Sequence, residues 1–173
     1  EANTAKGTFP MDPKRAKYRL ELDTARTAPW WTLSTKTYTT WTFYSERPKN
    51  DEVEIIPLLL IDYDIDLDLL NRAPKPSERK GSLTINLTVR HQHGAEKIPI
   101  EGVRLWTSYD DGESWKEVKN LKSLGKNKFR GITNEQNPKK TSGYVSLKVE
   151  ARDRDGNRIE QEIIRAYGLT PRN

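Results

Sequence analysis

The amino-acid sequence predicts an all-β protein, folded as an antiparallel β-sandwich. Apolar and polar residues alternate with a period of two along several stretches, which is typical of strands that bury one face. Gly, Pro, Asn and Asp separate these stretches at the spacing expected of short connections. No stretch carries a convincing helical period. Five Trp, seven Tyr and three Phe among 173 residues favour a packed core over a disordered chain.

The first third of the chain predicts two strands after an irregular start. Residues 1–16 are rich in Pro, Lys, Thr and Ala, and are expected to be a flexible entry. Residues 18–23 alternate strictly and predict the first strand. After a loop at residues 24–29, the β-branched and aromatic run 32–44 predicts a long strand. Trp41, which lies inside this run, is expected to point into the core.

The middle of the chain predicts three more strands. Residues 53–60 form one, interrupted by Pro57, which is tolerated at an edge or a bulge. Residues 61–69 alternate apolar residues with aspartates and form another. The Pro-rich and basic segment 73–80 is expected to be a linker or a long loop. Four aliphatic residues at alternate positions of 83–89 are expected to face the core.

The last part predicts a hairpin, a loop-rich region and two closing strands. Residues 103–118 predict the hairpin, with its tip at an Asp-Gly pair. The basic segments 121–129 and 134–142 are expected to be mostly loop. Residues 144–152 and 158–167 alternate well, and a second Asp-Gly pair between them predicts their turn.

The spacing of these strands predicts one complete β-sandwich domain, preceded by a segment with too few strands to form a domain of its own. Residues 53–173 are expected to form an immunoglobulin- or fibronectin-like antiparallel β-sandwich. Residues 1–52 hold too few strands to bury a core alone. We therefore expect them to form an N-terminal β segment that packs on the sandwich or completes a sheet begun upstream.

Composition limits the classes of function. The net charge of +5 comes from 30 basic and 25 acidic residues that are interleaved, which indicates a solvated surface and disfavours nucleic-acid binding. Without cysteine the chain holds no disulfide, thiolate metal site or cysteine nucleophile. Its longest apolar run is too short to span a bilayer, and it opens on a polar stretch rather than a signal peptide.

A short motif lies at the tip of the predicted hairpin. The pattern Ser-x-Asp-x-Gly-x-Ser-Trp, formed by Ser108, Asp110, Gly112, Ser114 and Trp115, resembles the Asp-box of sialidases and of many secreted β-proteins. The Asp carboxylate can accept hydrogen bonds from turn N–H groups, the glycine supplies a positive φ, and the tryptophan covers the hairpin. The motif therefore predicts a way of folding a turn, and not a reaction.

Tryptophans are the best candidates for ligand binding. Trp30 and Trp31 follow Pro29 outside the alternating runs and are expected to be exposed, where a sugar ring or an apolar side chain could stack on them. Trp106 is expected in the core and Trp115 over the hairpin.

Two groups of residues raise the question of a metal. The acidic strand, Asp62–Asp68, carries an aspartate at every second position and could contribute to a calcium site. Neighbouring carboxylates on one strand face stand about 7 Å apart, however, which is too far for all four to bind one ion. We therefore favour a solvent-exposed strand face, or charges that prevent edge-to-edge pairing with another sheet. His91 and His93 share the spacing of one strand face but have no evident third ligand. No cofactor is therefore predicted, and calcium stays open.

Several blocks of sequence together resemble the C-terminal, non-catalytic region of secreted bacterial subtilisin-like serine peptidases. These blocks are Tyr18–Asp23 through Thr40–Phe43, Pro57–Asp64, Trp106–Trp115, Gly143–Asp153, Asp155–Asn157 and Ile163–Tyr167. The resemblance implies that the family's catalytic residues lie upstream and outside this chain, because none of its triad motifs can be matched here.

The resemblance leads to an expected function. It implies an extracellular, non-catalytic β-rich module that supports an upstream catalytic domain of the same polypeptide, or that binds protein substrate or a surface. The alternative is a carbohydrate-binding β-sandwich that holds a polysaccharide on Trp30 and Trp31. A sialidase-type hydrolase fragment would need several Asp-box repeats, and the sequence contains one.

Overall fold

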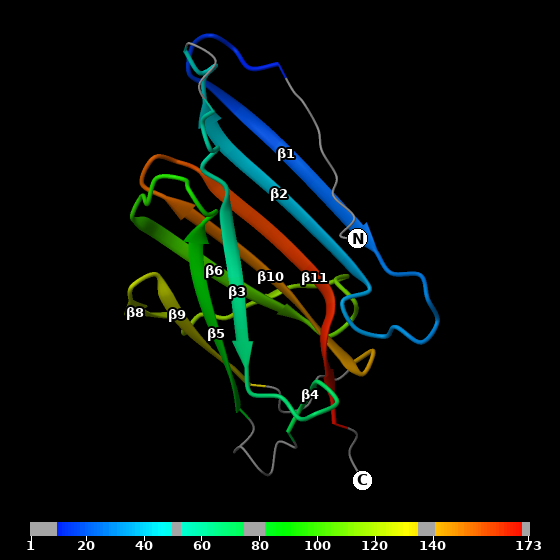
Figure 1. Cartoon of the computed structure of the whole chain (residues 1–173). Helices are drawn as coiled ribbons and strands as arrows, with labels where there is room; N and C mark the ends of the chain where they lie inside the picture. Colours follow the sequence, from blue (N-terminus) through cyan, green and yellow to red (C-terminus); the bar gives the residue numbers. More distant parts are fainter. Residues whose placement is uncertain (1–9, 50–52, 75–81, 135–140, 171–173) are drawn as a thin grey trace.

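The structure is all-β, as the sequence predicts, and consists of two antiparallel sheets that pack face to face (Figure 1). It is a computed structural model that describes residues 10–49, 53–74, 82–134 and 141–170. The strands are β1 (Ala16–Ala25), β2 (Lys36–Ser45), β3 (Leu59–Ile65), β4 (Arg72–Ala73), β5 (Ser82–His91), β6 (Ile100–Ser108), β7 (Lys116–Glu117), β8 (Lys122–Gly125), β9 (Lys128–Asn134), β10 (Tyr144–Asp153) and β11 (Arg158–Leu169).

The larger sheet has the order β1-β2-β11-β10-β6-β7, with the short β4 pairing in parallel with the end of β11. The smaller sheet has the order β3-β5-β9-β8. In Figure 1 the strands of the smaller sheet lie across β6, β10 and β11, whereas β1 lies beyond their edge. Since β2 pairs with β11, the N-terminal hairpin β1–β2 continues the larger sheet. The division of the chain at residue 52 stays a prediction.

Two apolar clusters fill the space between the sheets. The first joins aliphatic residues of β5 to those of β6 and β10, and includes the fully buried Tyr167 of β11. The second gathers around Trp41 and Phe43 of β2, which pack with Leu59, Val89, Ala151 and Ile159. The interior therefore continues under β2, and the predicted core position of Trp41 is confirmed.

Two hydrogen bonds join the sheets across this interior. Trp41 Nε1 donates a hydrogen bond to the carbonyl of Leu59, 2.8 Å away, and so joins β2 to β3. Tyr63 of β3 donates its hydroxyl hydrogen to Gln161 Oε1 of β11 at 3.0 Å. Burial raises the pKa of Tyr63, so its hydroxyl stays protonated and available as a donor.

The predicted strand boundaries need three corrections. Residues 53–58 are not a strand, because Pro57 offers no N–H to a ladder, and β3 begins only at Leu59. The predicted strand over 61–69 ends at Ile65, where a turn begins to form toward β4. The predicted loop 121–129 instead contains β8 and the start of β9.

The predicted core position of Trp106 is wrong. Leu105 and Thr107 of β6 are buried, and neighbouring residues of a strand point to opposite faces. Trp106 is only half-buried, on the other face of the sheet, where the guanidinium of Arg104 stacks 4.5 Å from the ring centroid and Lys148 lies 5.9 Å from it.

None of the described residues forms a helix long and apolar enough to cross a membrane.

Candidate binding site: the tryptophan loop

The connection between β1 and β2, residues 26–35, carries the two most prominent exposed rings, and we call it the tryptophan loop. Trp30 is 80% exposed and Trp31 is 47% exposed, as the sequence predicts. The amide of Arg26 donates to the carbonyl of Thr35 at 2.8 Å and so closes the base of the loop. A second hydrogen bond, from the amide of Trp31 to the carbonyl of Ala28 at 2.9 Å, forms a turn through Pro29. The loop is therefore a braced turn that holds two indole rings at the surface.

An open hollow of about 380 Å³ lies beside these rings. The guanidinium of Arg26 stacks over the ring of Trp31, with its central carbon 4.4 Å from the centroid. Most of the lining belongs to the loop itself, and two residues come from other parts of the fold. The lining consists of Arg26, Trp30, Trp31, Thr32, Leu33, Ser34, Asn71 and Ala166. The hollow thus combines aromatic faces, one cation and neutral hydrogen-bonding groups, which suits a ligand that is apolar on one side and polar on the other.

Unusual backbone conformations surround the hollow. Ser34, Asn71 and Arg165 have φ angles of 46°, 55° and 58°, in the left-handed region that residues other than glycine rarely adopt. The amide of Ser34 donates to the carbonyl of Arg165 at 2.8 Å, and the amide of Gly168 donates to the carbonyl of Asn71 at 2.9 Å. Such conformations cost energy and persist where neighbouring contacts hold them. The tryptophan loop is therefore fixed on β11 rather than free in solvent.

The hairpin tip at residues 108–115 has the local structure that its residues predict. Asp110 Oδ1 accepts hydrogen bonds from the amide of Ser114 at 2.9 Å and from the hydroxyl of Ser108 at 2.7 Å. The Ser108 oxygen in turn accepts from the amide of Gly112 at 2.8 Å. Gly112 has a φ of 92°, and a Cβ there would lie 3.4 Å from the ring of Trp115, which covers the turn.

This hairpin tip is connected to the tryptophan loop through Arg165. The Arg165 guanidinium donates two hydrogen bonds to the Asp111 carboxylate, at 3.0 and 2.7 Å, and stacks 4.7 Å from the ring centroid of Tyr144. These hydrogen bonds hold the pKa of Asp111 below its usual value. Since the carbonyl of Arg165 also accepts from Ser34, one residue joins both turns. No local sequence pattern indicates this role of Arg165, because its partners Asp111 and Ser34 are distant in the sequence.

The hydrogen bonds at the hairpin tip predict a pH-dependent stability. Those from Ser114 and Ser108 lower the pKa of Asp110 from 3.8 to about 2. Because the folded-state pKa is depressed, the contribution of Asp110 is complete above about pH 4 and is lost as the pH falls toward 2. We expect Asp110→Asn to destabilise the protein at pH 6 and to have little effect at pH 2. Urea unfolding of both proteins across this range measures the difference, and a difference independent of pH would contradict the prediction.

The acidic strand faces solvent. Asp62 receives two hydrogen bonds from Arg90, at 2.8 and 3.2 Å, and Asp64 receives one from Asn86 at 3.3 Å. Asp68 accepts from the amides of Leu70 and Arg72 in the turn after β3. No group of three or more metal-ligating side chains occurs among the described residues. Asp62, Asp64 and Asp68 are thus engaged with separate neighbours, and β3 is an edge strand, where such charges disfavour pairing with another sheet.

The two histidines do not share a strand face. His91 is the last residue of β5 and is buried, with its Nε2 atom 3.0 Å from Oδ2 of the buried Asp153. His93 lies beyond the end of the strand and is exposed. The paired-imidazole hypothesis therefore fails, because β5 ends before the second histidine is reached.

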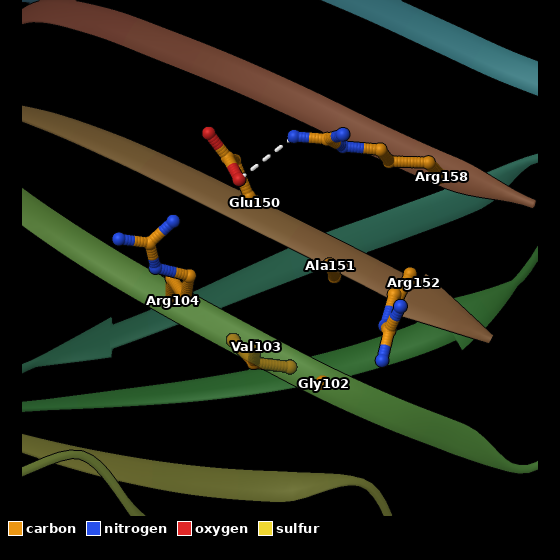
Figure 2. A pocket seen from close by; sticks show the side chains of 7 residues that line it. All are labelled: Gly102, Val103, Arg104, Glu150, Ala151, Arg152 and Arg158. Carbon is orange, nitrogen blue, oxygen red and sulfur yellow. Dashed lines mark hydrogen bonds and ion pairs between the residues drawn. The ribbon is translucent and has the colours of Figure 1, made fainter.

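A second hollow, of about 390 Å³, lies on the outer face of the larger sheet (Figure 2). Its lining comes from β6, β10 and the start of β11, and consists of Gly102, Val103, Arg104, Glu150, Ala151, Arg152 and Arg158. Each of its arginines already has a carboxylate neighbour, as in the 2.8 Å contact of Arg158 with Glu150. The hollow therefore presents paired charges, and we favour the tryptophan loop as the binding site.

Comparisons of the chain with protein-family models, with curated proteins and with solved structures find no match.

Proposed function

We propose that this chain is a non-catalytic accessory module of a secreted bacterial subtilisin-like serine peptidase, and that the tryptophan loop is its binding surface. In this role the module holds protein substrate or a surface near the catalytic domain upstream in the same polypeptide, or packs against that domain. The proposal rests on the resemblance of the sequence blocks described above. The observation that carries the binding role is the braced loop that keeps Trp30 80% exposed.

The chemistry of the hollow favours a protein ligand. Exposed Trp and Arg are the side chains that contribute most to protein–protein contacts, because they offer a large apolar area together with hydrogen-bond donors. Trp30 provides an open indole face, and Arg26 beside Trp31 provides a cation that could meet a carbonyl or a carboxylate. The braced backbone adds affinity, because little conformational entropy remains to be lost on binding.

The role can be tested in the parent peptidase with the double variant Trp30→Ala/Trp31→Ala. We expect the KM for an unfolded protein substrate to rise about tenfold, the loss typical of removing an aromatic contact worth over 1 kcal/mol, while cleavage of a short peptide is unchanged. Faster thermal inactivation with both substrates equally affected would instead assign the loop to support of the catalytic domain. Leu124→Ala, which truncates a side chain that is 51% exposed on β8, is the matched control. Unchanged kinetics and stability in the double variant would contradict both roles.

The alternative function is carbohydrate binding by the same two rings, because indole faces also stack on sugars. Titrating the chain with a panel of polysaccharides while following tryptophan fluorescence separates the two. A response that the double variant abolishes would favour the carbohydrate-binding module, and its absence together with protein binding would favour the accessory role.

A further inference from the structure

Strand β1 is a long and regular sheet edge. It runs for ten residues, contains neither Pro nor Gly, and pairs with β2 in an unbroken register. Proteins usually protect such edges by shortening them, by bulges or by charged side chains, and charges of a single sign also repel the same strand of a second copy. The other sheet ends among the described strands follow that rule, since β7 has two residues, β8 has four, and β3 presents aspartates. Among the described strands at the sheet ends, β1 is thus the one that is both long and charged with both signs.

The exposed face of β1 carries four charges that β2 does not balance. The first half of the strand is basic, with Lys17 and Arg19, and the second half is acidic, with Glu21 and Asp23. The residues of β2 opposite them are all uncharged, namely Tyr44, Thr42, Thr40 and Tyr38. Arg19 contacts Glu21 along the same strand, and no ion pair involves Lys17 or Asp23 among the described residues. Lys17 and Asp23 are thus available to a strand that pairs on the open side, and Arg19 and Glu21 could exchange their exposed contact for one with that strand.

We propose that two copies of this chain associate through β1, paired antiparallel about a two-fold axis at Leu20, so that their larger sheets become one continuous sheet. In that register the numbers of two residues that lie opposite each other, one in each copy, sum to 40. Lys17 of one copy then faces Asp23 of the other, and the two-fold symmetry produces this pair twice. Arg19 likewise faces Glu21 of the second copy. Directly opposed charges of unlike sign stabilise a strand pair, whereas like charges destabilise it.

The charges also exclude the neighbouring registers. A two-fold axis perpendicular to the sheet requires an even sum, because opposed residues must lie on the same face. If the axis moves to residue 19, Arg19 of one copy lies opposite Arg19 of the other. If it moves to residue 21, Glu21 lies opposite Glu21. The register centred on Leu20 is thus the one that pairs every charge on β1 with an opposite charge.

The apolar face of β1 supports the same register. Tyr18 stacks on Phe43 with ring centroids 5.8 Å apart, but Leu22, further along the strand, is 52% exposed because the smaller sheet does not reach it. In the proposed pair Leu22 faces Tyr18 of the second copy, and Leu20 faces Leu20. Association would cover these side chains and extend the apolar surface of one copy onto the other.

Sedimentation across micromolar concentrations tests the proposal with charge variants. We expect wild-type chain to form a dimer. We expect Arg19→Glu, which creates two Glu–Glu contacts, to raise the dissociation constant at least about tenfold. The double variant Arg19→Glu/Glu21→Arg exchanges the charges, restores both pairs and should restore the dimer. Lys122→Glu, the same charge change on the exposed β8 strand, is the control and should leave the dimer intact. A wild-type chain that stays monomeric, or a double variant that does not recover, would overturn the proposal.

Single cysteines test the register directly, because the chain has none of its own. We expect Leu20→Cys to form a disulfide-linked dimer under mild oxidation, since opposed Cβ atoms near the axis lie about 5 Å apart. In Ala16→Cys the two thiols would be separated by eight residues, about 27 Å, and should not cross-link. Equal cross-linking at both positions would overturn the proposed pairing, and circular dichroism establishes that each variant is folded.

Discussion

Trp41→Ala is expected to destabilise the protein by about 4 kcal/mol, because it removes the largest side chain of the second core cluster. Trp41 is 9% exposed, packs with Leu59 and Ile159, and bridges the two sheets through its hydrogen bond to the carbonyl of Leu59. The substitution would leave a cavity between β2 and the smaller sheet, and would leave the buried carbonyl without this donor. Chemical unfolding followed by circular dichroism measures the loss.

Two further variants separate the causes. Trp41→Phe keeps an aromatic ring but removes the N–H group, so we expect a smaller loss, with about 1–2 kcal/mol from the missing hydrogen bond. Trp30→Ala removes the same side chain from a site that is 80% exposed, and should change stability by less than about 0.5 kcal/mol. If the Trp41 and Trp30 truncations had similar effects, the N-terminal hairpin would not share the core with the rest of the chain.

The strands that bury one face were the predictable part of the fold. The alternation in residues 83–89 predicted β5, and the four aliphatic residues expected to face the core are all buried. β2 and β10 largely follow the same pattern, and both Asp-Gly turns lie where they were expected. The period of two is a reliable signal for such strands because every second side chain must leave water.

The strands β8 and β9 were missed because their sequences lack that signal. All four residues of β8 are exposed, so no apolar alternation marks it. β9 contains Gly131, which reads as a loop residue, yet a Cβ at that position would lie 2.9 Å from Leu105 Cδ2. Glycine is needed there because the strand passes close to the core, and a close approach between distant segments is not visible in a local pattern.

The candidate site was predictable only in part. Trp30 and Trp31 stood out because they fall outside the alternating runs. Asn71 and Ala166 reach the hollow through the parallel pairing of β4 with the end of β11, which no local pattern indicates. The loop supplies the aromatic rings, and the tertiary fold supplies the wall opposite them.

The buried polar network was missed although strand alternation pointed to it. His91 lies an even number of residues from the core residues of β5, so it belongs to the same strand face. Asp153 is related in the same way to the core residues of β10. Both side chains point inward, and they meet between the sheets. His91 was considered as a possible metal ligand, whereas a polar side chain can also be buried in a core when its hydrogen bonds are satisfied.

Asp153→Ala is expected to cost about 3–5 kcal/mol, comparable to removing one partner of a buried ion pair. The Asp153 carboxylate accepts hydrogen bonds from the amides of Asp155 and Asn157, at 3.0 and 2.9 Å, and from the Asn157 side chain at 2.8 Å. It also lies 3.0 Å from His91 Nε2, and Asn157 Oδ1 accepts from the amide of Tyr44 at 3.1 Å. One carboxylate therefore organises the β10–β11 turn and connects it to both sheets.

The matched control is Asp155→Ala in the same turn, where the side chain is exposed and the loss should stay below about 0.5 kcal/mol. The double variant His91→Ala/Asp153→Ala should lose less stability than the sum of its single variants, because each single change leaves the other group buried without its partner. Additive losses would show that the two side chains act independently, so that the turn alone depends on Asp153. A coupling of about 1 kcal/mol or more would instead show that the polar contact between His91 and Asp153 helps to join the two sheets.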